Sequence, residues 1–308
     1  AFYAVDLDWC FTYVNNKAEE LWGRSRDELV GTNIWDEFPE AVGSEPYRQI
    51  KRAMEEGITT EFETISPVLD AWVAGRAYPS AEGLSVYFRD VTERKRAEEE
   101  IRRSEETQRF LAEASSVLAS SLDYRETLAS VARLAVPALA DGCAVDVLVE
   151  NGHPERLAVE HPDPEPVRMA YELERRYPPD PDAPGGLHQV LRTGEPEMMA
   201  EIPEELVEQA ARDEWHRELL RKLDLRSYMI VPLVARGRTL GAISFVSAES
   251  GRHYGEADLR LAKELARRSA LAVDNARLYE EAQSSRNQLE AILRGVADGI
   301  TAQDPSGK

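Results

Sequence analysis

The pattern of apolar and polar positions changes sharply near Asp90. Before that residue, short runs of aromatic and β-branched residues are separated by Pro, Gly, Asp or Ser, which is typical of strands joined by turns. Two such runs come first, short helical segments follow, and three further runs end the region. This order predicts a five-stranded antiparallel sheet with helices on one face. The expected strands cover residues 2–5, 11–14, 60–65, 71–78 and 84–89.

The helical segments between these strands carry start signals. Asn15 or Asn16 is available to cap a short helix that ends at Trp22. Ser25 and Glu28 have the spacing of a capping box, in which each side chain bonds the backbone amide of the other residue.

A highly charged helix is expected from Asp90 to about Leu122, because Asp90 and Glu93 have the spacing of a helix start. Apolar residues recur along it at intervals of three and four, but several of the positions are polar. A two-stranded coiled coil and a solvated single helix both account for this pattern. The positions are Ala97, Ile101, Ser104, Gln108, Leu111, Ser115, Leu118 and Leu122.

A second mixed region extends to about Leu278. Between His153 and Pro196 the density of proline is high, and we expect an irregular excursion there, either an ordinary surface loop or a lid over a pocket. The expected elements are helices over 124–139 and 204–223, a strand over 143–149, and a hairpin whose strands 228–233 and 239–247 flank Gly237.

The long helix expected from Asp258 onward carries a continuous heptad pattern. An Asn at an a position pairs well with its own copy and poorly with an aliphatic residue, so Asn275 favours a parallel, in-register dimer. The alternative is a helix that packs this stripe on its own domain over the first turns. The d positions are Leu271, Leu278, Ser285 and Ile292, and the a positions are Asn275, Ala282, Leu289 and Val296.

Composition and charge narrow the class of protein. The 308 residues are 43% hydrophobic, which excludes a wholly disordered chain. The net charge of −20 disfavours binding to nucleic acid or to anionic lipid. No stretch is long and apolar enough for a membrane span, no signal peptide is visible, and the two distant cysteines suit a reducing compartment, so we expect a cytoplasmic protein. Both ends look cut, so the sequence is expected to be a fragment.

No motif in the sequence makes a positive case for catalysis, for a metal site or for a cofactor. All five histidines come after residue 150, and none has the spacing of a zinc site. There is no phosphate-binding loop ending in Lys-Ser or Lys-Thr, and no nucleophile elbow. Cys143 lies among apolar neighbours in an expected strand, which indicates a packed thiol rather than a nucleophile.

Three regions of the chain resemble known families. Residues 11–15, 25–31 and above all 86–95, which read VYFRDVTERK, resemble a PAS domain and its exit into an output helix. Residues 230–233, 241–245 and 265–279 resemble a GAF domain. Residues 292–307 are similar to the opening of a second PAS domain.

These resemblances imply an α+β fold and the following organisation. The PAS-like domain covers 1–90, a linker helix 91–110, the GAF-like domain 111–281, a coiled-coil linker 282–294, and the start of a second PAS-like domain 295–308. Departures from the family motifs weigh against flavin, bilin and cyclic-nucleotide binding; Ala262, for example, stands where a cyclic-nucleotide GAF domain has Glu.

The implied function is that of a non-catalytic sensory and dimerisation region, the input part of a sensor histidine kinase in a two-component phosphorelay. A ligand in the PAS or GAF pocket, or a partner, would shift the packing of helices in a parallel homodimer. The alternatives are a serine phosphatase, a diguanylate cyclase, a transcriptional regulator or a GAF-type enzyme. The residues expected to carry the relay and the dimer are Asp90, Thr92, Glu93, Leu271, Asn275 and Leu278.

Overall fold

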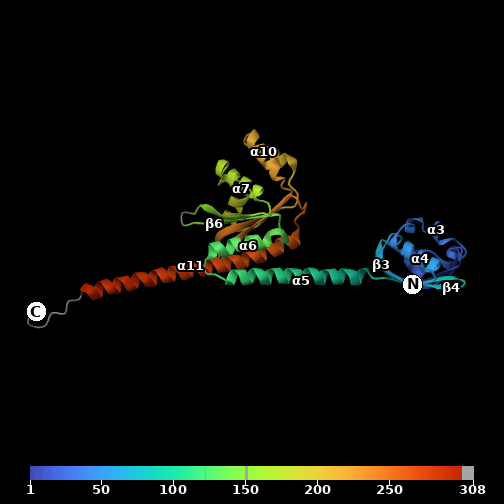
Figure 1. The fold of residues 1–308 in the computed structure, drawn as a ribbon. Coiled ribbons are helices and arrows are strands. Elements are labelled where there is room, and N and C mark those ends of the chain that lie inside the picture. Colours follow the sequence, from blue (N-terminus) through green and yellow to red (C-terminus); the bar gives the residue numbers. More distant parts are fainter. Residues whose placement is uncertain (122, 150–151, 300–308) are drawn as a thin grey trace, which may run out of the picture. The chain divides into compact units, whose positions relative to one another are not determined.

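The computed structural model describes residues 1–121, 123–149 and 152–299, with side chains as far as residue 292. The chain divides into two compact units between Glu106 and Thr107 (Figure 1).

The first unit is a five-stranded antiparallel sheet in the order β2-β1-β5-β4-β3. The five strands and the helix-start signals expected from the sequence are all present. Its elements are β1 (Phe2–Val5), β2 (Phe11–Val14), α1 (Asn16–Trp22), α2 (Arg26–Leu29), α3 (Ile34–Glu37), the 3-10 turn η1 (Pro39–Ala41), α4 (Glu45–Glu56), β3 (Thr60–Ser66), β4 (Ala71–Ser80) and β5 (Gly83–Asp90).

Local side-chain bonds explain where the short helices begin. The Asn15 side chain accepts a hydrogen bond from the Ala18 amide at 3.0 Å, which caps α1. Ser25 and Glu28 form the expected capping box at the start of α2. The helices bury Ala18, Leu29, Ile34, Ile50 and Ala53 in the same cluster as the inward-facing residues of the sheet, so the core lies between the sheet and its helices.

Helix α5 (Thr92–Ala119) runs without a break from the first unit into the second. It begins two residues after Asp90, which is the last residue of β5. The capping position therefore falls on Val91, and Glu93 is only two residues beyond it. Within the described residues Glu93 makes no reciprocal bond to Asp90, so the expected box does not form here. Leu122, the expected end of the helix, lies outside the described residues.

The second unit contains another five-stranded antiparallel sheet, in the order β7-β6-β10-β9-β8. Together the two sheets and their helices confirm the expected α+β fold. The elements of this unit after α5 are α6 (Tyr124–Ala138), β6 (Gly142–Leu148), β7 (Pro154–Glu160), α7 (Pro164–Arg176), α8 (Leu187–Thr193), β8 (Glu197–Met199), α9 (Glu204–Ala210), α10 (Glu214–Leu223), β9 (Ser227–Ala235), β10 (Arg238–Ser247) and α11 (Glu256–Gly299).

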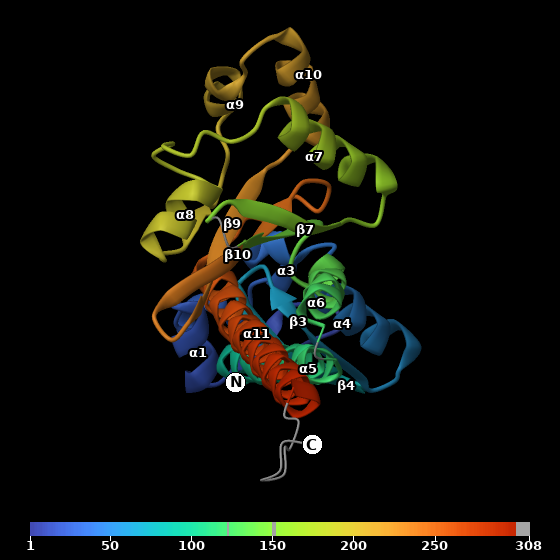
Figure 2. The same ribbon diagram turned by 90° about the vertical axis from the view of Figure 1, so that its left-hand side faces the viewer.

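The two faces of this second sheet are covered by different helices. Helices α6 and α11 pack on one face and bury the largest apolar cluster of the chain, which includes Cys143, Val231 and Phe245. Helices α7 to α10 lie on the other side of the sheet (Figures 1 and 2). On that side Val190 of α8 packs against Ile230 and Ala242.

Two expectations for this unit are wrong. The segment from His153 to Pro196 is not irregular throughout, because it contains β7, α7 and α8; its longest irregular stretch covers residues 177–186. The helix expected over 204–223 is two helices. Asp213 separates them, because its side chain accepts a hydrogen bond from the His216 amide at 2.8 Å and caps the start of α10.

The last helix, α11, continues as far as Gly299. Residues 295–299, where the resemblance placed the start of a second PAS domain, are the end of this helix, and residues 300–308 lie outside the described residues. The side chain of Val296, the last expected a position, is also outside them.

Candidate functional site

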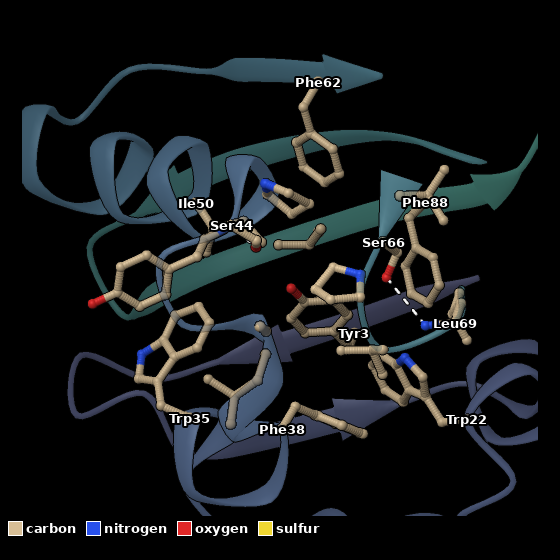
Figure 3. Close-up of a pocket in the computed structure, with 18 residues that line it drawn as sticks. Tyr3, Trp22, Trp35, Phe38, Ser44, Ile50, Phe62, Ser66, Leu69 and Phe88 are labelled. Atoms are coloured by element: carbon tan, nitrogen blue, oxygen red, sulfur yellow. Dashed lines mark hydrogen bonds between the residues drawn. The ribbon is translucent and has the colours of Figure 1, made fainter. Parts of the chain in front are cut away.

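A cavity of about 70 Å³ lies in the first unit between the sheet and helices α1 to α4. Its wall is made largely of aromatic rings, which come from strands and helices far apart in the sequence (Figure 3). Aliphatic residues, two prolines, Ser44 and Ser66 complete the wall. The rings belong to Tyr3, Trp22, Trp35, Phe38, Tyr47, Phe62 and Phe88.

The rings hold one another in place. Trp22 stacks on Phe88 with 5.3 Å between the ring centroids, and Tyr3 lies 5.4 Å from Trp22. Aromatic pairs at such distances add about 0.5–1.5 kcal/mol to the burial of the rings themselves. The rings of the wall therefore pack closely on one another.

The polar groups at this cavity are few and neutral. Among the described residues that line it, none carries a charge. Ser44 and Ser66 accept hydrogen bonds from the amides of Tyr47 and Leu69, at 3.3 and 3.4 Å. The Tyr3 hydroxyl points into the cavity (Figure 3), and burial raises the pKa of Tyr3, so this group is a neutral phenol at physiological pH. A small apolar molecule with one hydrogen-bonding group suits such a wall.

The volume limits what fits. A cavity of about 150 Å³ holds a benzene ring, so about 70 Å³ accepts only a few heavy atoms unless the side chains of the wall move. A flavin or a haem does not fit between these side chains as they stand.

The joint between the sheet and α5 is built on the backbone of Trp72 in β4. The Trp72 amide donates a hydrogen bond to Thr92 Oγ1 at 3.0 Å, and the Trp72 carbonyl accepts one from the Val91 amide at 2.8 Å. Asp90 Oδ1 in turn accepts from the Thr92 amide at 2.8 Å. Hydrogen bonds from Thr92 lower the pKa of Asp90, so this carboxylate stays charged. The start of α5 is thus bonded to strand β4 through both the amide and the carbonyl of Trp72.

Ion pairs extend the same joint to the edge strand β3. Glu63 binds Lys95 at 2.5 Å and Arg94 at 2.6 Å, and the Lys95 ammonium lies 5.2 Å from the centre of the Trp72 ring. The structure brings Thr92 and Asp90 together at this joint, while Glu93 lies exposed in the first turn. Sequence reasoning missed Glu63 and Trp72, because their roles depend on strand pairing between residues far apart in the chain.

The expected dimerisation residues form an exposed stripe on α11. Leu271 and Leu278 are 43% and 39% exposed, and Asn275 between them is also exposed. The helix packs on its own domain through other residues, among them Ala270 and Val273, which are fully buried. The alternative that this stripe packs on its own domain over the first turns is therefore wrong. Farther along, Leu289 and Ile292 are 60% and 54% exposed.

A buried network of charges in the second unit was not expected from the sequence. The side chain of Asp146 in β6 is 1% exposed and binds Arg156 in β7 at 3.0 and 3.3 Å. Arg156 also binds Glu174 of α7 at 3.1 Å, and burial raises the pKa of both Asp146 and Glu174. Arg156 forms part of the wall of a cavity of about 200 Å³ between the sheet and α7. Only the pairing of β6 with β7 brings Asp146 opposite Arg156.

Three further observations concern the described residues. Cys143 is 2% exposed and burial raises the pKa of its thiol, which confirms a packed thiol. Across the described ranges, no cluster of His, Cys, Asp and Glu could hold a metal ion. Nor does any helix there combine the length and apolarity needed to cross a bilayer.

Each of the two units matches the model of a known protein family. The family model of the PAS fold matches residues 1–96, and the family model of the GAF domain matches residues 123–273. These matches confirm the resemblance of the first region to a PAS domain and of the second region to a GAF domain. No curated protein matches the chain.

Solved structures that resemble the chain include two bacterial GAF domains. The GAF domain of a phosphoenolpyruvate-protein phosphotransferase from Coxiella burnetii is 18% identical, with 57% of this chain and 96% of that chain covered and a TM-score of 0.43. A GAF domain/HD domain protein from Geobacter sulfurreducens is 20% identical, with 53% of this chain and 98% of that chain covered and a TM-score of 0.38.

Proposed function

We propose that this chain, a PAS domain joined through α5 to a GAF domain, is the input region of a cytoplasmic sensor histidine kinase in a two-component system. PAS and GAF domains are sensory units of signalling proteins, and the chain itself would sense and relay rather than catalyse. The output activity would reside elsewhere in the same protein.

The observation that carries this proposal is the joint between β4 and α5. Both backbone groups of Trp72 are bonded to residues 91 and 92, so a small displacement of the strand moves the start of the helix. Strand β4 also lies against the cavity, since Val73 belongs to its wall. A change in the cavity would thus reach the first turn of α5 through a single strand.

The ligand in this proposal is a small neutral molecule that fills the PAS cavity and bonds the Tyr3 hydroxyl. The absence of charge among the residues of the wall favours an uncharged guest, because a buried charge needs a partner. Since about 70 Å³ is available, a larger guest would displace rings such as Phe62 or Phe88. Displacement of such a ring would push on strands β4 and β5, so that binding of a guest in the cavity would shift these strands. The GAF cavity beside Arg156 is a second candidate site.

A parallel homodimer through α11 completes the proposed mechanism. The exposed stripe from Leu271 to Ile292 would meet its own copy, with Asn275 setting the register at the cost of some stability. In the same heptad frame Glu281 occupies g and Arg286 occupies e. A parallel, in-register pair brings Glu281 of one copy next to Arg286 of the other, so opposite charges would face each other.

The test of this function is the reaction of the full-length protein with ATP. A histidine kinase is expected to acquire a phosphoryl group whose bond to nitrogen is labile in acid and stable in base. Thr92→Val is expected to change the rate of this reaction without abolishing ATP binding. Phosphatase or cyclase activity in place of autophosphorylation would replace the kinase assignment and leave the sensory role intact.

A further inference from the structure

Within the second unit, α5 and α11 are joined by one cationic side chain. Arg268 of α11 donates from Nη1 to the Leu111 carbonyl oxygen at 3.1 Å and to Ser115 Oγ at 2.6 Å. Both acceptors belong to α5, and they lie one helical turn apart. The Arg268 side chain is 33% exposed, so much of it is shielded from solvent. Hydrogen bonds from a charged group under such conditions are stronger than those between neutral groups.

The guanidinium of Arg268 is held in position from its own helix. Its Nε donates to Glu264 at 2.8 Å, and Glu264 also accepts two bonds from Arg267 at 2.9 Å. Hydrogen bonds from these two arginines lower the pKa of Glu264 to about 2, so its carboxylate remains charged at physiological pH. The direction in which Arg268 extends toward α5 is therefore fixed by Glu264.

The acceptors on α5 specify one register. Ser115 Oγ itself donates to the Leu111 carbonyl at 2.8 Å, so the two acceptors form a single local unit. A slide of α5 by one turn, in either direction, would bring the side chain of Leu111 or Ala119 to the place of Ser115. Neither side chain accepts a hydrogen bond. The contact with Arg268 is therefore complete in the present register and incomplete in the neighbouring ones.

Apolar residues of α5 also pack against this unit. Ala114 and Leu118 are buried in the same cluster as residues of α6 and α11. Apolar packing has no preferred direction and changes gradually with displacement, whereas a hydrogen bond weakens steeply once its angle falls below about 120°. Arg268 supplies the directional part of the connection.

We infer that Arg268 is the positioning residue that couples α5 to α11, so that a displacement starting at Thr92 is passed to the C-terminal part of the chain. This inference rests on the proposed relay and assigns its second link. The first link joins the PAS sheet to α5, and Arg268 joins α5 to the helix that leaves the GAF domain. Retention or loss of the bonds to Leu111 and Ser115 gives the link two distinct states.

Hydrogen exchange of the whole chain tests the inference. Thr92→Val supplies the perturbation, and the readout is the exchange of amides 280–292 of α11. We expect Thr92→Val to change that exchange by about threefold or more when Arg268 is present, and to leave it unchanged in a chain that also carries Arg268→Gln. Ser115→Ala is expected to act like Arg268→Gln, while Ser115→Thr, which keeps the hydroxyl, restores the response.

Arg267→Gln is the matched control. Arg267 shares Glu264 with Arg268, but its side chain is 58% exposed and has no bond to α5, so its loss should leave the transmitted response intact. A local readout accompanies the transmitted one: Arg268→Gln is expected to speed exchange of amides 107–119 about tenfold. Arg268→Lys keeps the charge without the planar fork and serves if the glutamine variant folds poorly.

The outcomes separate the inference from the proposed function. If Thr92→Val alters α11 equally with and without Arg268, the relay stands and the role of Arg268 is wrong. If Thr92→Val leaves α11 unaltered in the otherwise unchanged chain, the relay itself fails and the inference fails with it. A loss of transmission in the Arg267→Gln control would also overturn the assignment to Arg268.

Discussion

At the scale of single residues, the hydroxyl of Thr92 links strand β4 to the start of α5. The hydroxyl accepts a hydrogen bond from the Trp72 amide at 3.0 Å, and the Thr92 amide donates one to Asp90 Oδ1. A residue that bonds on both sides of the boundary between strand and helix makes the two elements move together.

Replacing Thr92 with Val keeps the shape of the side chain and removes the acceptor. The Trp72 amide then lacks its partner, and we expect the free energy of unfolding to fall by about 1–3 kcal/mol. Urea titration followed by circular dichroism measures the change. Thr92→Ser keeps the hydroxyl and should stay close to the unaltered chain; equal stability of all three proteins would contradict the role given to this bond.

The pH dependence of stability offers a second prediction, centred on Glu264. Hydrogen bonds from Arg267 and Arg268 lower its pKa from 4.5 to about 2 in the folded state. A depressed carboxyl pKa stabilises the folded state above the unfolded value, and the contribution disappears as the pH falls toward the folded value. The stability difference between the unaltered chain and Glu264→Gln should therefore be constant above about pH 6 and shrink between pH 4.5 and 2.

The measurement is denaturant unfolding at several pH values within that range. Glu256→Gln is a suitable control, because Glu256 is exposed at the start of the same helix. A difference for Glu264→Gln that does not change with pH would show that its carboxylate is not held by the two arginines.

Of the residues at the joint between the sheet and α5, only those close to the helix start in the sequence were predicted. The spacing of Asp90 and Glu93 predicted the helix start, and the resemblance to a PAS exit pointed to Asp90 and Thr92. These two residues bond each other there, and Thr92 also bonds Trp72. Trp72 and Glu63 could not be predicted, because a backbone amide and a surface carboxylate acquire their roles only when β3 and β4 pair beside the helix. Cys143 was predicted correctly, since its apolar neighbours in the sequence are also its neighbours in the core.

At the scale of elements, strand pairing shapes the PAS cavity. Phe62 of β3 lies opposite Gly75 of β4, and its ring occupies the space where a larger residue would have a side chain. A Cβ added to Gly75 would lie 2.1 Å from Phe62 Cζ. The Phe62 ring can keep its position in the wall of the cavity because Gly75, opposite it on β4, has no side chain.

Gly75→Ala is expected to push the Phe62 ring toward the cavity and to destabilise the domain by about 1–3 kcal/mol. Thermal unfolding measures the loss of stability. Ala74→Ser, one residue away on the opposite face, should have little effect. Adding Phe62→Leu should recover part of the loss, and failure of that recovery would indicate that the clash is not with this ring.

The elements themselves were predicted best where the signal is local. Strands β1 to β5 follow runs of aromatic and β-branched residues between turn residues, and β6 and the hairpin of β9 and β10 follow the same rule, whereas β7 was missed. The prediction failed where proline density was read as loop. Prolines in the first turn of α7 are compatible with a helix, because their missing amide has no partner there in any case. The break between α9 and α10 was missed, although Asp213 is a residue type that commonly caps the start of a helix.

At the scale of the whole molecule, the exposed stripe on α11 sets the expectation of a dimer. In the proposed parallel arrangement Glu281 of each copy faces Arg286 of the other, which gives two equivalent pairs of opposite charge. Within one copy, Arg286 already lies 3.5 Å from Glu290. The pairs between copies would therefore contribute modestly and act mainly on orientation.

Glu281→Arg replaces both attractive pairs by repulsive ones, and we expect the dimer to dissociate about fivefold to tenfold more readily at low salt. The double variant Glu281→Arg with Arg286→Glu restores opposite charges and should restore association. Sedimentation equilibrium over a range of protein concentrations measures both effects.

Two further variants define the interface independently of these charges. Leu289→Glu places a charge in the middle of the stripe and should abolish association, whereas Gln283→Glu, outside the a and d positions, should not. An antiparallel dimer would respond to Leu289→Glu but not to the charge swap. A chain that stays monomeric at high micromolar concentration, with Asn275→Leu changing nothing, would rule out the dimer.

The predictions at this scale rest on the change of pattern at Asp90 and on the heptads after Leu271, because both features extend over many residues. What the sequence did not reveal is how α11 divides its surface. Val273 and Ala276 are buried on the domain while Leu271 and Leu278 are exposed, so apolar residues serve two different faces of one helix. Hydrophobicity alone cannot assign a residue to either face.

The distribution of tryptophan has a practical consequence. Of the five tryptophans, Trp22 and Trp35 are in the wall of the PAS cavity, Trp9 lies 5.2 Å from Trp35, and Trp72 is at the joint with α5. Only Trp215 belongs to the second unit. The intrinsic fluorescence of the unlabelled chain therefore originates mainly from tryptophans in or near the wall of the PAS cavity and at the joint between β4 and α5. Libraries of small volatile or aromatic compounds can be screened by emission alone, and a Trp215→Phe variant would remove most of the background.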